Sequence, residues 1–96
     1  MRPTHTGILK MEEIIKQFEY MYFEAEPFRE TSIRGILEMC TMLGSNSVAE
    51  KKREFLKDFD ENQEFLEKLK GHPMFTSRCE KCIEQIDKLR NLVQNF

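Results

Sequence analysis

The sequence lacks several features that mark common protein classes. Its 96 residues include no tryptophan, only four glycines and three prolines, and an odd number of cysteines, three. An odd cysteine count does not make the disulfide framework of a small secreted domain, so we expect a reducing, cytoplasmic location. No stretch alternates between apolar and polar residues, and we therefore expect no β-strand.

Long apolar runs and a strong net charge are absent as well. No apolar run is long enough to cross a bilayer, and residues 1–10 lack the apolar core of a secretory signal. The formal net charge is −2, which gives no strong attraction to nucleic acid or to an anionic membrane. We expect neither a membrane nor a nucleic acid as the principal partner.

What is present is the composition of a small soluble helical protein. Apolar residues make up 40% of the chain and charged residues 33%, and a chain of this length forms one domain. Eight phenylalanines and six methionines predict a core of adaptable side chains. Residues 1–7 show no periodicity and are expected to be a disordered leader, whereas residues 8–96 form a single helical-bundle domain.

The clearest helical pattern lies in residues 77–96. Apolar residues recur there at alternating steps of three and four, the seam of a helix that packs on another helix. The seam consists of Cys79, Cys82, Ile86, Leu89, Val93 and Phe96. Such a helix is soluble only if its apolar stripe lies against a partner, which the rest of the chain must supply.

Residues 47–70 form a longer seam that ends before Gly71. Two long helices joined by a short turn predict an antiparallel helical hairpin. Asn62 occupies a seam position and would need an internal hydrogen-bond partner.

Two capping boxes predict where the helices of the hairpin begin. Ser47 with Glu50, and Ser77 with Glu80, have the spacing at which a hydroxyl and a carboxylate satisfy the free amides of a first turn.

A first helix is predicted from Ile8 or Lys10 to Glu24, and Pro27 is expected to end it. Residues 26–30 are then a connector, and Thr31 or Ser32 caps the next helix.

This second helix is predicted to end at Leu43, with Gly44 as its left-handed stop. Its apolar stripe consists of Ile33, Ile36, Leu37, Cys40 and Leu43. Met39 and Met42 widen the stripe, so we expect a central helix that is packed on two sides, with Gly35 at a close helix crossing. The predicted fold is all-α: a small up-down bundle of four helices with a long antiparallel C-terminal hairpin.

Cys79 and Cys82 are the most suggestive chemical motif. They lie on the first turn of a helix beside Arg78, where helix amides and a cation favour the thiolate. A metal- or redox-responsive regulator would use them with Cys40 and His72. A pair at this spacing without a strand before it is more often two small apolar residues of a core, so no metal or cofactor is expected.

Two further patterns have simple explanations. Lys51, Lys52 and Arg53 follow a glycine turn, as in a helix-turn-helix DNA-binding regulator, but Glu50 stands where that motif needs an apolar residue. Acidic residues gather on the same helix at Asp58, Asp60, Glu61 and Glu64, without a histidine at a suitable spacing. Both groups are expected to be solvated surface, and we predict no catalytic residue and no enzyme.

Apolar residues off the narrow seams are the remaining candidates for function. These are Tyr20, Phe23, Phe28, Met39 and Met42. Aromatic residues and methionines are favoured in interfaces, although the same residues can also fill a core. The leading hypothesis is a small cytoplasmic module that binds another protein or a second copy of itself, and we expect a homodimer. The hairpin would outreach the first two helices and leave part of its seam uncovered.

Overall fold

A computed structural model describes residues 5–24 and 26–96, apart from the side chains of residues 5, 6 and 26–28. Four α-helices and one short π-helix account for most of these residues, and the described part contains no strand. The elements are α1 (His5–Glu19), η1 (Tyr20–Glu24), α2 (Glu26–Leu43), α3 (Ser45–Lys70) and α4 (Thr76–Gln94). The prediction of an all-α fold with four helices is confirmed. Within the described residues, no helix combines the length and the apolar character that spanning a membrane requires.

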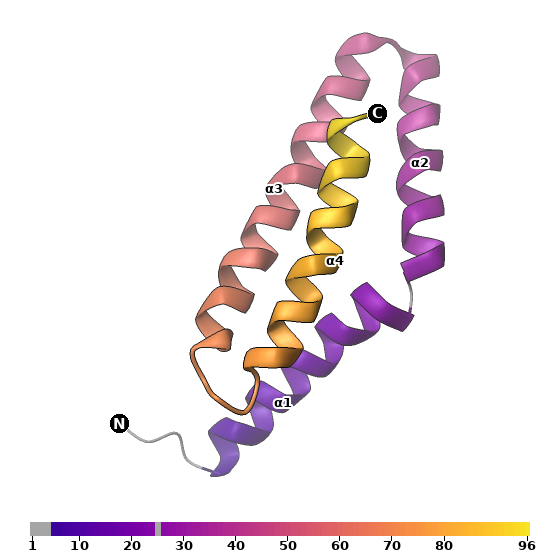
Figure 1. Ribbon diagram of the computed structural model, residues 1–96. Helices are drawn as coiled ribbons and strands as arrows, with labels where there is room; N and C mark the ends of the chain where they lie inside the picture. The colour runs from indigo at the N-terminus through magenta and orange to yellow at the C-terminus, as the bar shows by residue number, and fades with distance from the viewer. Residues whose placement is uncertain (1–4, 25) are drawn as a thin grey trace.

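α3 and α4 form the long antiparallel hairpin that the sequence predicts (Figure 1). Its core holds buried side chains from both helices: Phe59, Leu66 and Leu69 of α3, and Cys79, Cys82, Ile86, Leu89 and Val93 of α4. Five of the six predicted seam residues of α4 are therefore buried. The prediction for Phe96 is wrong. α4 ends at Gln94, so Phe96 lies outside the helix and the heptad spacing does not determine its direction; its side chain is exposed.

The first half of the chain lies along this hairpin. α1 and η1 contact α4, α2 contacts α3, and α2 continues toward the opposite end of the molecule from α1 (Figure 1). Ile15, Tyr22, Ile33 and Leu37 enter the common core from this side. The molecule is elongated, with principal extents of 51 × 23 × 19 Å.

Both predicted capping boxes are wrong. α3 begins at Ser45, not Ser47, and α4 begins at Thr76, not Ser77, and neither start has a side-chain cap. Gly44 has a φ of 119°, which ends α2 and lets the next helix begin at the following residue. At the other turn, the Thr76 hydroxyl donates to the Lys70 carbonyl at 2.8 Å and fastens the two helix ends together.

The first two helices also begin earlier than predicted. α1 begins at His5, within the expected leader, and α2 begins at Glu26, not at Thr31 or Ser32. Pro27 lies in the first turn of α2, where a missing N–H costs nothing and the fixed φ suits a helix. Pro27 thus lies at the start of α2 and does not end the preceding helix; the π-helix η1 ends before it, at Glu24.

Asn62 has the internal partner that its seam position requires. Its side-chain Nδ2 donates to Tyr22 Oη at 2.7 Å, and Tyr22 is fully buried. The Tyr22 ring also stacks on Phe18, and the Arg29 guanidinium lies 5.5 Å from its centroid. This cluster ties η1 to the middle of α3.

Candidate interaction surface

α2 buries one side against α3 and leaves a second apolar side in water. Ile33, Leu37 and Cys40 are buried. The second side, here called the outward face of α2, consists of Gly35, Ile36, Met39, Met42 and Leu43. Met39 is 68% exposed, Met42 88% and Leu43 78%, and Ile36 is also exposed. Isolated exposed apolar residues are ordinary, but four within two turns of one helix form a patch.

The prediction that α2 is a central helix packed on two sides is therefore wrong. Ile36 and Leu43 were placed in its core stripe, but α3 covers a narrower arc than the apolar arc of α2. Gly35 does not mark a close helix crossing, because a Cβ built there meets no atom within 4 Å. Three of the five stripe residues, Ile33, Leu37 and Cys40, are buried as expected, and no element among the described residues covers the other two.

The outward face merges with an unusually uncharged turn. Residues 39–49 contain no Asp, Glu, Lys or Arg, although charged residues make up 33% of the chain. This run crosses the end of α2, Gly44 and the start of α3. Charge depletion together with methionine is typical of the centre of a protein interface. It is also the sequence signal that could have identified Leu43 as part of an exposed surface.

The same region projects beyond α4. Lys52 Nζ donates to the carbonyl of Gln94, the last helical residue of α4, at 3.4 Å. Seven residues of α3, Ser45–Lys51, come before Lys52 and extend about 10 Å beyond the end of α4. Figure 1 shows the α2–α3 turn beyond the C-terminus. We call residues 36–51 the tip; among the described residues, it consists of two helices packed on each other.

The five predicted partner-binding residues do not form one surface. Met39 and Met42 lie together on the outward face. Tyr20 and Phe23 are exposed in η1, at the other end of α2, and they line two different hollows. The side chain of Phe28 lies outside the described residues. The structure thus brings together two of the five, and joins them with Ile36 and Leu43.

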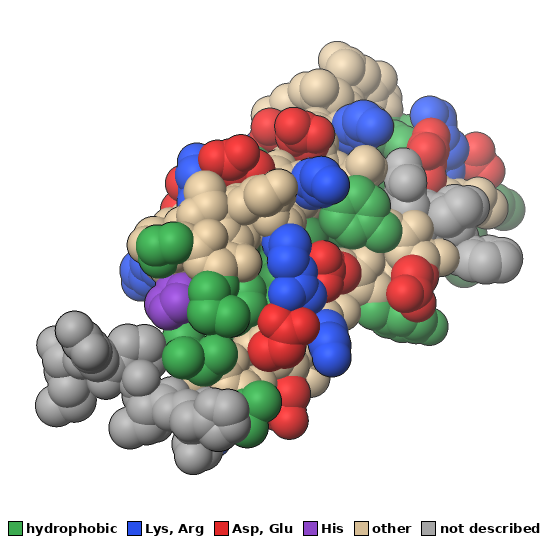
Figure 2. Space-filling view, turned by 60° about the horizontal axis from the view of Figure 1, so that its bottom comes forward, with side chains coloured by type: hydrophobic (Ala, Val, Ile, Leu, Met, Phe, Trp, Pro, Cys, Tyr) green, Lys and Arg blue, Asp and Glu red, His purple; other side chains and the backbone are tan. Residues whose placement is uncertain are grey.

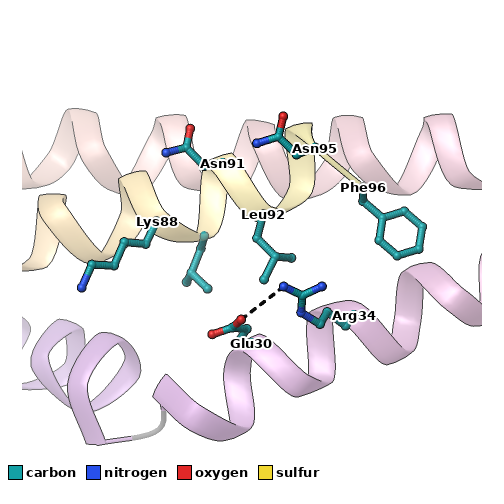
Figure 3. A pocket seen from close by; sticks show the side chains of 8 residues that line it. Glu30, Arg34, Lys88, Asn91, Leu92, Asn95 and Phe96 are labelled. Atoms are coloured by element: carbon teal, nitrogen blue, oxygen red, sulfur yellow. Dashed lines mark hydrogen bonds and ion pairs between the residues drawn. The ribbon is translucent and has the colours of Figure 1, made fainter.

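A groove of about 380 Å³ runs between α2 and α4 on another side of α2 (Figure 3). Leu89, Leu92 and Phe96 supply its apolar lining, and the Arg34 guanidinium, 3.4 Å from the Glu30 carboxylate, lies at its α2 wall. Arg34 and Met39 of the outward face are five residues apart, which places them about 140° apart around the helix axis. The groove and the outward face are therefore separate surfaces.

The thiols of Cys79 and Cys82 lie in the hairpin core. Both side chains are fully buried, and burial raises the pKa of Cys79 and raises that of Cys82 to about 11. The expectation that Arg78 favours a thiolate is wrong, because desolvation outweighs its charge. The Arg78 guanidinium instead donates to Glu12 at 2.6 Å and to Glu19 at 2.5 and 3.1 Å, which fastens α1 to α4.

The alternative metal ligands are not assembled in the described part of the chain. Cys40 is a free, buried thiol on the α2 part of the tip, whereas His72 lies in the turn at the other end of the hairpin. The His72 ring lies 5.3 Å from the ring of Phe75, and its Nδ1 accepts the Met74 amide at 3.4 Å. No group of three potential metal ligands occurs among the described residues.

Two residues of the basic run and two of the acidic residues of α3 make polar contacts at the surface. Lys51 lies 2.9 Å from the Glu54 carboxylate, and Lys52 contacts the end of α4. Asp60 accepts from Arg90 at 3.1 Å, and Glu64 lies 3.7 Å from Lys68. Figure 2, which looks toward the α3–α4 turn, shows acidic and basic side chains intermingled on that side. These charges behave as a solvated surface.

Comparisons with protein-family models, with curated proteins and with solved structures find no match to this chain. The inference of function therefore depends on its own residues and their arrangement.

Proposed function

We propose that this protein is a small cytoplasmic protein-interaction module that binds through the outward face of α2. It acts by occupying a partner surface, with no bond made or broken, and it calls for no catalytic residue, metal or cofactor. The single observation that carries the proposal is that Ile36, Met39, Met42 and Leu43 are all exposed to water within two turns of one helix.

The size of the patch supports a specific interaction. Burying a methionine or leucine side chain fully contributes about 1.5–3 kcal/mol, so Met39, Met42 and Leu43 at their exposed fractions contribute roughly 3.5–7 kcal/mol before the costs of association. A few central side chains carry a comparable share of the binding energy in characterised interfaces. The methionines adapt their shape to a partner because their side chains are unbranched.

The position of the patch on a helix indicates the form of the contact. Met39 and Leu43 are four residues apart, and Ile36 precedes Met39 by three, so they line one side of two successive turns. A helix that lies along this side would meet all three. Helix-on-helix contact is thus the expected mode of binding.

The proposal is tested by site-specific photo-crosslinking in cells of the protein's own source. A photoreactive side chain replaces Met39 in the full chain, and in a matched control it replaces Met74. Met74 is 61% exposed but lies in the α3–α4 turn, away from the tip. We expect defined protein adducts from position 39 that position 74 does not give. Equal, diffuse labelling from both positions would contradict the proposal.

A further inference from the structure

We infer that the partner of the outward face is a second copy of the chain, and that two tips pair about a twofold axis into a four-helix section. This inference depends on the proposed function and names the partner of the same surface. Three observations lead to it: the number of helices at the tip, the absence of charged residues from positions 39–49, and the area that the outward face exposes.

The first observation is that the tip is an incomplete bundle. Over most of its length the hairpin is covered by a third helix, because α1 and η1 contact α4 and α2 contacts α3. α2 contacts α3, and their connecting turn lies beyond the C-terminal end of α4 (Figure 1). Two helices alone cannot enclose an apolar layer. A second tip brings two helices, which is the number that a four-helix section needs.

The second observation is that the tip can face its own copy without repulsion. Identical surfaces carry identical charges, so a charged patch opposes self-pairing about a twofold axis. Residues 39–49 carry no charged side chain, and the run is bounded by Glu38 and Glu50, which are exposed to water. Pairing through this run buries no charge and leaves both carboxylates at the rim.

The third observation is the area of the patch. From their exposed fractions, the four apolar side chains of the outward face present on the order of 400–500 Å² per chain. Two copies would therefore bury on the order of 1,000 Å² in total, near the lower limit of specific interfaces. The dimer is accordingly expected to be reversible, with a dissociation constant on the order of micromolar.

Sedimentation equilibrium of the full chain over a wide concentration range tests this inference. The wild-type mass is expected to rise from the monomer value of 11.5 kDa toward twice that value. Met39→Glu should weaken association by about tenfold or more, because it places a charge in the centre of the interface. Met74→Glu makes the same chemical change at a similarly exposed site, and it should leave association unchanged.

A second variant reports on the tip directly. The chain has no tryptophan, so Leu43→Trp introduces a single indole at the tip. Its emission should shift to shorter wavelength as the concentration rises, whereas Met74→Trp should show no shift.

A wild-type chain that stays at 11.5 kDa throughout, or an association that Met39→Glu does not alter, would overturn the inference. If the chain is monomeric but position 39 crosslinks to a different protein in cells, the second copy is wrong as partner and the proposed function stands. If neither association nor crosslinking occurs, both are wrong.

Discussion

The hydrogen bond between Asn62 and Tyr22 should link two parts of the chain that are forty residues apart. Tyr22→Phe removes the hydroxyl and keeps the ring, its stacking on Phe18 and its burial. We expect a loss of about 1 kcal/mol in the free energy of unfolding, since the partly exposed Asn62 amide can turn to water. Asn62→Leu should cost more, about 1–3 kcal/mol, because it leaves a hydroxyl without a partner on a fully buried tyrosine.

The double variant distinguishes a true pair from two separate packing effects. Once both polar groups are gone, no unsatisfied group remains, so the combined loss should be smaller than the sum of the single losses by about 1 kcal/mol. Urea unfolding followed by far-ultraviolet circular dichroism measures each free energy. Tyr20→Phe is the matched control, because the Tyr20 side chain is 63% exposed in the same π-helix; its effect should stay within about 0.5 kcal/mol.

Strictly additive losses would refute this reasoning, as would a Tyr22→Phe effect no larger than that of Tyr20→Phe. Either result would mean that the hydrogen bond does not hold η1 to α3 in solution.

Three further predictions concern the core, the α1 contact and the turns. Burial raises the pKa of Cys82 to about 11, so the folded state keeps the neutral thiol at a pH where the unfolded chain already loses its proton. The free energy of unfolding should therefore fall as pH rises from about 9 to 11. Cys82→Ala should reduce this fall, as measured by urea titrations. Arg78→Met should lower the protection factors of the α1 amides in hydrogen exchange measured by mass spectrometry. Because the Arg78 contact lowers the pKa of Glu12, acid below about 4.5 should also lower these protection factors, once each rate is divided by the intrinsic exchange rate at that pH. Gly44→Ala should destabilise the dilute chain by about 1 kcal/mol or more, because Gly44 has a positive φ. Gly35 lies in an open helical position, so Gly35→Ala should stabilise the chain by about 0.4–1 kcal/mol. Equal changes in stability for the two variants would contradict this distinction between the two glycines.

The hairpin could be predicted from the sequence because one period governs it throughout. Between Cys79 and Val93 every expected seam position is buried, and the only error, Phe96, lies beyond the end of the helix. The seam position of Asn62 predicts that it has an internal hydrogen-bond partner, but it does not predict which residue that partner is. That partner comes from η1, and a π-helix has no local pattern that would place the Tyr22 hydroxyl against α3.

The starts of α2 and α3 could not be predicted because two local rules competed at each of them. Ser47 with Glu50 fits a capping box, but the positive φ of Gly44 allows α3 to begin earlier. Pro27 was read as the end of one helix, whereas it lies in the first turn of the next. Both outcomes were decided by how α2 meets α3 and η1, which no local pattern describes.

The candidate surface was predicted in part, for a similar reason. An apolar arc wider than one neighbour can cover was visible on α2, and Met39 and Met42 were assigned to a partner. Which side α3 covers is a matter of packing, so Ile36 and Leu43 were assigned to the core. Tyr20 and Phe23 are exposed as expected, but they lie in η1, at the other end of α2 from the tip.

Methionine oxidation provides the most direct test of whether another protein chain covers the outward face in the cell. In the dilute isolated chain, exposure alone ranks Met42 at 88% above Met39 at 68% and Met74 at 61%. Mass spectrometry after brief oxidation of intact cells of the source should reverse this order, with Met39 and Met42 protected and Met74 modified most. If the three methionines are oxidised in cells in the order of their exposure, the outward face is open to water and the account is contradicted.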